Sequence, residues 1–161
     1  MKEIADIALE YDLMVIADEI YENLIYEDEH HSIASLEEAY ERTVTVSGFS
    51  KSFAMTGWRI GYLHAHEEMI PQITKVHIPF SICAPVVSQY AALAALQGAQ
   101  DCVTEFRNHY ISMRNLMCER LDRLGSIFAY EKPNGSYLMF PKILLEEGKD
   151  STAFCKRLLK E

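Results

Sequence analysis

The segment SGFSKSFAMTGWRIGY, residues 47–62, decides how this chain is interpreted. It places Lys51 between two serines and Arg59 just before an apolar stretch. The flanking segments TVTVSG (43–48) and RIGYLHA (59–65) are rich in β-branched or aromatic residues and are bounded by glycine or polar residues, which predicts two strands. A lysine between such strands is either a solvated loop residue or a nucleophile beside a phosphate group.

Helical and strand-like patterns alternate upstream of this segment. Residues 1–12 place Ile4, Ile7 and Ala8 at helical intervals, and LMVIA at 13–17 is wholly apolar. Apolar strands between helices are typical of a mostly parallel sheet that is covered on both faces. We therefore expect an α/β fold whose ligands bind at the carboxyl ends of the strands.

The second half of the chain predicts two helices and a further strand. PVVSQYAALAALQG (85–98) begins with proline and ends with glycine, which are start and stop signals for a helix. A longer helix of about six turns follows from Asp101, a candidate N-cap, to Gly125. Its expected apolar stripe is Val103, Phe106, Tyr110, Met113, Met117, Leu121 and Leu124. KPNGSYLMFPKI (132–143) is interpreted as a turn followed by a strand.

Composition bounds the partners and the compartment. The net charge of −9 argues against nucleic acid or an anionic membrane, because both require a basic face. Cys83, Cys102, Cys118 and Cys155 include no CxxC pair, which favours reduced thiols. No apolar run approaches the roughly 20 residues of a membrane span, and residues 1–12 do not resemble a signal peptide. We expect a cytoplasmic protein.

Three charged side chains fall where predicted strands end or begin. Asp18 follows the first strand, Lys51 follows the second, and Arg59 begins the third. An aspartate can pair with a protonated ring nitrogen, a lysine can form a Schiff base, and an arginine with nearby serines can bind a phosphate. These are the needs of pyridoxal 5'-phosphate.

Two motifs then resemble one known family. GFSKSFAMTGWRIG (48–61) resembles the lysine signature of the class I and II aminotransferases, which are pyridoxal-phosphate enzymes. IADEIYENLIYE (16–27) resembles the strand and turn that precede it in that family. The segment from Arg114 through residue 143 is similar to the family's inter-domain helix and the opening of its small domain. Two motifs in the correct order are far more specific than a lone SxK.

The resemblance implies a role for five residues. Lys51 is expected to be the Schiff-base lysine, which also transfers the proton. Asp18 is expected to keep the pyridinium nitrogen protonated, and Tyr21 to hydrogen-bond the ring oxygen. Ser50 and Arg59 are expected to bind the phosphate. We also expect burial and the charge of Arg59 to lower the pKa of Lys51.

Structural interpretations stand beside these roles. Asp18 can cap a turn, Tyr21 can be a half-buried core residue, and Arg59 can pair with Glu67 or Glu68. One position departs from the family pattern at the phosphate site. Many family members have a serine three residues before the lysine, whereas this chain has glycine there. The preceding serine is the candidate replacement. We expect no metal site at the histidine pairs, because they lack a third positioned ligand. The residues of these pairs are His30, His31, His64 and His66.

The resemblance further implies a division of the chain and a reaction. Residues 1–100 would belong to the large cofactor-binding domain, 101–125 to the inter-domain helix and 126–161 to the beginning of the small domain. The sheet would be only part of the large-domain sheet, because the family's asparagine-proline motif, glycine-rich loop and carboxylate-binding arginine are not in this sequence. We expect a homodimer that transfers an amino group from an amino acid to a 2-oxo acid. We also expect the 161-residue chain by itself to lack this activity.

Two alternatives remain open at this point. One is another pyridoxal-phosphate reaction on the same scaffold, such as that of a lyase or an aminocyclopropane-forming enzyme. The other is a non-catalytic ligand-binding or dimerisation domain attached to a regulator, since a fold alone does not decide a function.

Overall fold

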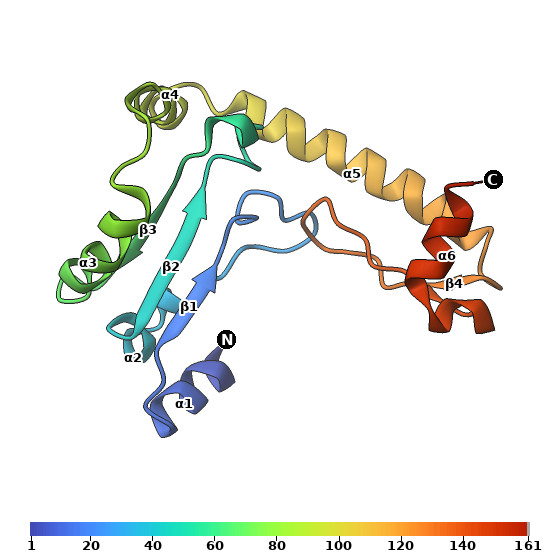
Figure 1. The fold of residues 1–161 in the computed structure, drawn as a ribbon, viewed down its shortest axis with the longest axis horizontal. Helices are drawn as coiled ribbons and strands as arrows, with labels where there is room; N and C mark the ends of the chain where they lie inside the picture. The colour runs from blue at the N-terminus through green and yellow to red at the C-terminus, as the bar shows by residue number, and fades with distance from the viewer. Residues whose placement is uncertain (161) are drawn as a thin grey trace.

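A three-stranded sheet forms the centre of the computed structural model, which describes residues 1–160 (Figure 1). β1 (Val15–Asp18) pairs in parallel with β2 (Thr43–Gly48), and β2 pairs antiparallel with β3 (Gly61–Ala65). The expected α/β class is confirmed, although only one of these two strand pairs is parallel. The reason lies in residues 49–60, which contain no α-helix that could return the chain to the other end of the sheet.

The remaining elements surround this sheet or follow it. The α-helices are α1 (Lys2–Glu10), α2 (Glu37–Tyr40), α3 (Ile70–Ser81), α4 (Val86–Gln97), α5 (Asp101–Asp122) and α6 (Ser151–Leu158). The 3-10 turns are η1 (Ile33–Ser35), η2 (Thr56–Trp58) and η3 (Glu146–Lys149), and two further strands are β4 (Phe128–Ala129) and β5 (Lys142–Ile143). The sequence pattern predicted α1, α4 and α5, whereas α3 and α6 were not anticipated.

One face of the sheet carries a small apolar core. Ala5 of α1, Ile33 of η1 and Ala39 of α2 are fully or almost fully buried there, and Val15 and Ala17 of β1 pack against them. The alanines let the helical backbones approach the strands closely. Burial of this face fixes the register of β1 and β2, because a slip by one residue would turn the packed side chains toward solvent.

Large apolar side chains remain exposed elsewhere in the described residues. Ile16 on the edge strand β1 is 76% exposed, and Phe80 at the end of α3 is 86% exposed. Val46 and Leu63, on the sheet face opposite the core, are each more than one third exposed. The expectation that both faces are covered is therefore not met within residues 1–160. Exposed apolar surface of this extent is typical of interaction sites and ligand-binding grooves.

The long helix α5 runs from the end of α4 toward the C-terminal elements (Figure 1). Its N-cap position is Gln100 and not the expected Asp101, and no side chain caps it. The expected stripe is also offset, because Met113 and Met117 are 44% and 50% exposed while Arg114 and Cys118 are buried. The guanidinium of Arg114 contacts Glu27 and the carbonyl of Pro133, so the face of α5 that carries Arg114 is buried.

The segment 132–143, expected to be a turn followed by a strand, is mostly irregular and ends in the two-residue strand β5. Pro133 and Pro141 lack the N–H that a ladder requires. The tip of this segment instead pairs with the loop after β1, through an isolated bridge between Ile25 and Gly135. Figure 1 shows these two loops side by side, on the open side of α5.

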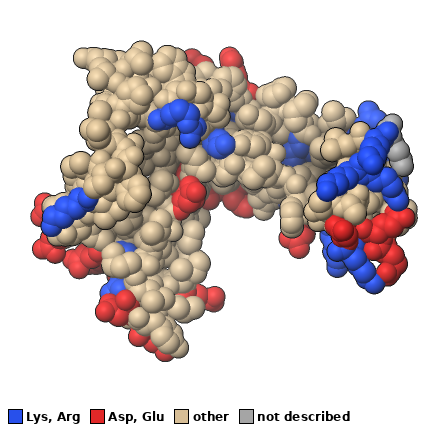
Figure 2. All heavy atoms as spheres, in the orientation of Figure 1, with Lys and Arg blue, Asp and Glu red and all other residues tan. Residues whose placement is uncertain are grey.

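Charged side chains are distributed unevenly over the surface. In the view of Figure 2 they gather at the C-terminal end, where basic and acidic groups alternate. Lys149 pairs there with Glu146, and Arg157 with Glu147. Among the helices of residues 1–160, none is both long and apolar enough to span a bilayer.

Candidate functional site

The carboxyl ends of β1 and β2 bring the predicted site residues to one end of the sheet. Asp18 is the last residue of β1 and pairs with Val46, near the end of β2. Lys51 follows β2 directly, in a turn. Arg59 precedes β3, whose first residue pairs with the last residue of β2. The strand register therefore places Asp18, Lys51 and Arg59 at the same end.

Two glycines allow the strands to approach closely at this end. Gly48 and Gly61 are paired partners, and a Cβ on Gly61 would lie 2.9 Å from the carbonyl oxygen of Ser47. A Cβ on Gly48 would lie 3.0 Å from the Cα of Gly61. The shorter distance leaves no room for a side chain at Gly61, whereas a Cβ at Gly48 would require the neighbouring backbone to shift by a few tenths of an ångström. The buried hydroxyl of Ser47 donates to Glu22 at 2.8 Å, so this candidate replacement is already engaged.

Lys51 is partly exposed, and its amine has one close hydrogen-bond partner among the described residues. Its Nζ donates a hydrogen bond to the hydroxyl of Tyr137 at 2.6 Å and lies 5.1 Å from the centre of the same ring. This hydrogen bond raises the pKa of Lys51, because a phenol oxygen that accepts from the ammonium stabilises the charged form. The expected lowering of the Lys51 pKa by Arg59 and burial is wrong for this state of the chain.

Tyr21 lies near the same amine and contacts Tyr137. Its ring meets that of Tyr137 edge to face, with 5.6 Å between the centroids, and the Lys51 Nζ is 5.9 Å from the Tyr21 centroid. Hydrogen bonding with Tyr137, and then burial, raise the pKa of Tyr21. Tyr21 is half-buried, and its hydroxyl lies beside Tyr137 and not in the core, so the core part of the structural alternative is not met.

The other predicted residues are more open to solvent. Asp18 is exposed and accepts a hydrogen bond from the backbone N–H of Ile20 at 3.3 Å, so it does cap the turn after β1. Ser50 is half-buried beside Lys51. Arg59 is exposed, adopts a left-handed backbone conformation with φ of 50°, and donates to the carbonyl of Thr56 at 2.9 Å.

Arg59 forms no ion pair with Glu67 or Glu68 among the residues that the structure describes. The alternative that this arginine is a purely structural partner of that acidic pair is therefore not supported. A guanidinium has five N–H donors, and the hydrogen bond from Arg59 to Thr56 uses Nη1.

Sequence reasoning missed Tyr137. It lies 86 residues from Lys51, so no local spacing connects them. The only signal was its position in a segment that already resembled the start of the family's small domain. Tyr110 of α5 stacks on Tyr137 at 5.7 Å and was assigned only to the apolar stripe.

Comparison with known proteins decides the family. The sequence model of the aminotransferase class I and II family matches residues 1–161. The chain belongs to this family. It is 43% identical to an aspartate aminotransferase of Pyrococcus abyssi over all of this chain and 41% of that protein. It is also 40% identical to aromatic-amino-acid aminotransferase 2 of Thermococcus litoralis, with the same two coverages.

Solved structures of this family have the same fold. The aromatic aminotransferase of Pyrococcus horikoshii superposes with a TM-score of 0.91 at 42% identity, over 99% of this chain and 43% of that one. The chain thus spans about two fifths of the length of the relatives it matches. Class I and II aminotransferases depend on pyridoxal phosphate.

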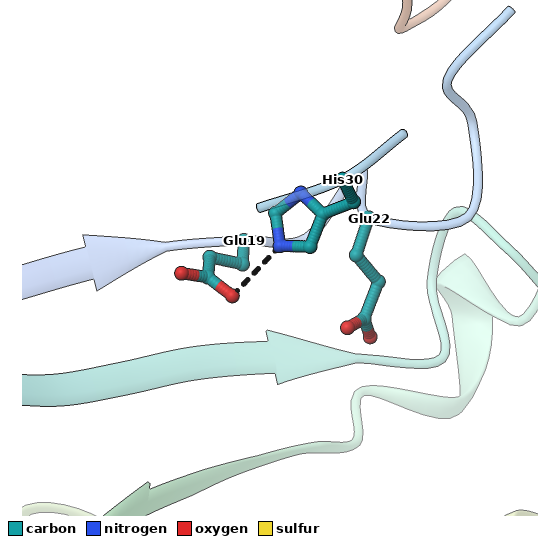
Figure 3. A group of neighbouring side chains, drawn as sticks. All are labelled: Glu19, Glu22 and His30. Carbon is teal, nitrogen blue, oxygen red and sulfur yellow. Dashed lines mark hydrogen bonds and ion pairs between the residues drawn. The ribbon is translucent and has the colours of Figure 1, made fainter. Parts of the chain in front are cut away.

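This aminotransferase chain also contains a second polar cluster, shown in Figure 3. Ligand atoms of Glu19, Glu22 and His30 lie within 4.8 Å of one another, and His30 Nε2 is 2.9 Å from Glu19 Oε2. Protein donors already use these carboxylates, because Ser32 donates to Glu19 at 2.7 Å and Ser47 donates to Glu22. We interpret the cluster as the hydrogen-bonded support of the turn that carries Tyr21.

Proposed function

We propose that the full-length protein is a pyridoxal-phosphate-dependent aminotransferase that transfers an amino group from an amino acid to a 2-oxo acid. The observation that carries this proposal is the amine of Lys51, hydrogen-bonded to Tyr137 at the same end of the sheet as Asp18 and Arg59, in a chain of the class I and II family. The relatives named above are aspartate and aromatic aminotransferases, which favours transamination over the lyase and regulatory alternatives.

The chemistry of the available groups fits the cofactor. One end of the sheet offers a carboxylate, a phenol, a hydroxyl, a guanidinium and a primary amine. Arg59 and Ser50 would bind the phosphate, Asp18 the ring nitrogen and Tyr21 the ring oxygen, while Lys51 would bond to the aldehyde carbon. When bound, pyridoxal phosphate supplies an acceptor for the electron pair that the substrate carbon retains after it loses its proton.

Each residue has a distinct task in this proposal. The Nζ of Lys51 must first lose a proton, because only the neutral amine is a nucleophile. Once free again, the same nitrogen removes the α-proton of the substrate and later returns it, as a general acid and base. The carboxylate of Asp18 would stabilise a protonated ring nitrogen by its charge, and the guanidinium of Arg59 would bind the phosphate.

The proposal extends to the arrangement of the whole protein. Residues 1–100 would form part of the large domain, 101–125 the connecting helix and 126–161 the start of the small domain. The exposed apolar groups of α3 and β1, such as Phe80 and Ile16, support a covering by other parts of the full-length protein or by a second subunit. A cytoplasmic homodimer is the assembly we propose.

The test replaces Lys51 and a matched lysine in the full-length protein. Lys51→Ala should lower transamination of aspartate and aromatic donors by at least about 10²- to 10⁴-fold, because the general acid–base step is lost. Lys75→Ala is the control, since the Nζ of Lys75 is exposed on α3 and bonds only within its own helix, to Gln72. Normal turnover by Lys51→Ala, or an equal loss in Lys75→Ala, contradicts the proposed function.

A further inference from the structure

The hydroxyl of Tyr137 is the closest partner of the Lys51 amine, although the two residues belong to different parts of the chain. Lys51 follows β2, whereas Tyr137 lies in the irregular segment beyond α5. Their separation of 2.6 Å is that of a charge-assisted hydrogen bond. This hydrogen bond is stable only if the segment that carries Tyr137 is itself held in place.

The backbone of that segment is held by the loop after β1. The N–H of Tyr26 donates to the carbonyl of Asn134 at 2.8 Å, and the N–H of Ser136 donates to the carbonyl of Leu24 at 2.8 Å. Tyr26 also donates its hydroxyl to the Ser136 carbonyl. Because the same loop carries Tyr21, these bonds fix Tyr137 relative to Tyr21.

The side of the segment that faces α5 is held by a buried arginine. Arg114 donates to the carbonyl of Pro133 at 3.0 Å, pairs with Glu27 at 2.9 Å and lies 5.0 Å from the Tyr26 ring centre. Ser136 adopts a left-handed conformation with φ of 63°, which directs the chain back toward the site. Residues on both sides therefore determine where the Tyr137 ring lies.

The Tyr137 oxygen is an acceptor for the ammonium. Lys51 is the donor in their hydrogen bond, since an ammonium has no lone pair to accept with. Hydrogen bonds from Lys51 and then Tyr21 lower the pKa of Tyr137, while the bond to Tyr137 raises the pKa of Lys51. Both directions follow from one arrangement, in which a partly negative phenol oxygen stabilises the positive amine.

We infer that Tyr137 is a positioning residue for the site: its hydroxyl holds the free amine of Lys51 as an ammonium beside Tyr21 and so determines the pH at which Lys51 becomes a nucleophile. The role assigned to the amine rests on the proposed function, but the contact itself does not. Loss of the Tyr137 hydroxyl should leave the amine in the same place and make it lose its proton at lower pH.

The experiment measures the amine of Lys51 without the cofactor. Full-length protein freed of pyridoxal phosphate is labelled with acetic anhydride over a range of pH, and the Lys51 peptide is quantified by mass spectrometry against the Lys75 peptide. Only the neutral amine reacts, so a group with a raised pKa is labelled only at higher pH. Tyr137→Phe keeps the ring contacts and removes the hydroxyl, and Tyr11→Phe is the control, because Tyr11 ends α1 at the opposite end of the sheet.

The expected result is a shift of the Lys51 labelling midpoint to lower pH in Tyr137→Phe, with labelling several-fold faster below the wild-type midpoint. Tyr11→Phe should match the wild type. Tyr137→Ala gives a second test: a packing role alone would increase labelling by one factor at every pH and leave the midpoint unchanged, and that result overturns the inference. An unchanged profile in Tyr137→Phe also overturns it. The Lys51→Ala activity assay tests the proposed function separately, whatever the labelling profile shows.

Discussion

Arg42 and Lys51 lie at opposite ends of the central sheet, and their charged groups are held differently. At the amino ends of β1 and β2, the guanidinium of Arg42 donates to the carbonyls of Ala8 and Leu13, at 3.4 and 2.9 Å, and to the carboxylate of Asp12 at 3.3 Å. At the carboxyl ends, the amine of Lys51 has a single phenol from a distant segment as its partner. Arg42 thus has three acceptors, from residues 8, 12 and 13, whereas Lys51 has one, so Lys51 can exchange its partner by breaking a single hydrogen bond.

This difference separates a structural charge from a reactive one. A guanidinium stays charged at any ordinary pH and can satisfy several carbonyl oxygens at once, so it stabilises the helix-to-strand junction. A lysine can lose its proton and change partners, which a covalent catalyst requires. The polar groups at the Arg42 end are therefore expected to determine stability, and those at the Lys51 end to determine activity.

The largest difference between the two ends is expected in kcat/KM, when the aspartate at each end is replaced by asparagine. Asp18→Asn in the full-length protein should lower kcat/KM by about 10²-fold or more, because an uncharged amide cannot stabilise a protonated ring nitrogen. Asp12→Asn should leave activity unchanged, since the Asp12 side chain is 97% exposed and asparagine tolerates its φ of 49°. Steady-state kinetics with saturating cofactor measure both, and equal activities in the two variants would break the comparison.

A smaller effect is expected from the close approach of the two strands at the Lys51 end. Gly61→Ala should lower the free energy of unfolding by about 1–3 kcal/mol, because its Cβ meets the backbone of Ser47. Gly57→Ala is the control in the neighbouring 3-10 turn, where a Cβ meets nothing within 4 Å. It should be neutral or stabilising by up to about 1 kcal/mol. Urea unfolding midpoints test this, and a neutral Gly61→Ala would show that the strands can separate freely.

The smallest effect compares two arginines by stability. Arg42→Ala should lower the free energy of unfolding by about 1–2 kcal/mol, since the carbonyls of Ala8 and Leu13 lose their donor. Arg59→Ala should change it by less than about 0.5 kcal/mol, because Arg59 is exposed and bonds only to the carbonyl of Thr56. Cofactor affinity, measured by equilibrium dialysis, should fall in Arg59→Ala alone. A fall in both variants would contradict the division between the two ends.

Local patterns in the sequence were sufficient to predict the strands and the positions of the charged groups. TVTVSG forms β2 over its full length, and Asp18 ends β1 as the apolar run 13–17 suggested. The end of a strand is a local property, because β-branched residues, glycine and register determine it. The antiparallel return of β3 and the helix α3 were not predicted, since they depend on how the chain packs and the apolar pattern of 70–81 has no clear period.

The contacts around Lys51 were beyond sequence reasoning for a physical reason. The pKa of a lysine depends on the atoms that surround its amine, and here the first of these belongs to Tyr137, on a segment that is irregular and not a strand. The direction expected from Arg59 and burial was wrong because no pattern indicated that acceptor. The pairing of Gly48 with Gly61 was also beyond local patterns, because it depends on the register of β2 and β3.

The central claim is that Lys51 is the residue that bonds to the cofactor, and one measurement tests it directly. Full-length protein is mixed with pyridoxal phosphate, reduced with borohydride and mapped by peptide mass spectrometry. A single reduced adduct is expected on Lys51, absent from Lys51→Ala and retained in Lys75→Ala. Adducts spread over Lys75, Lys132 and other exposed lysines, with none favoured at Lys51, would contradict the account.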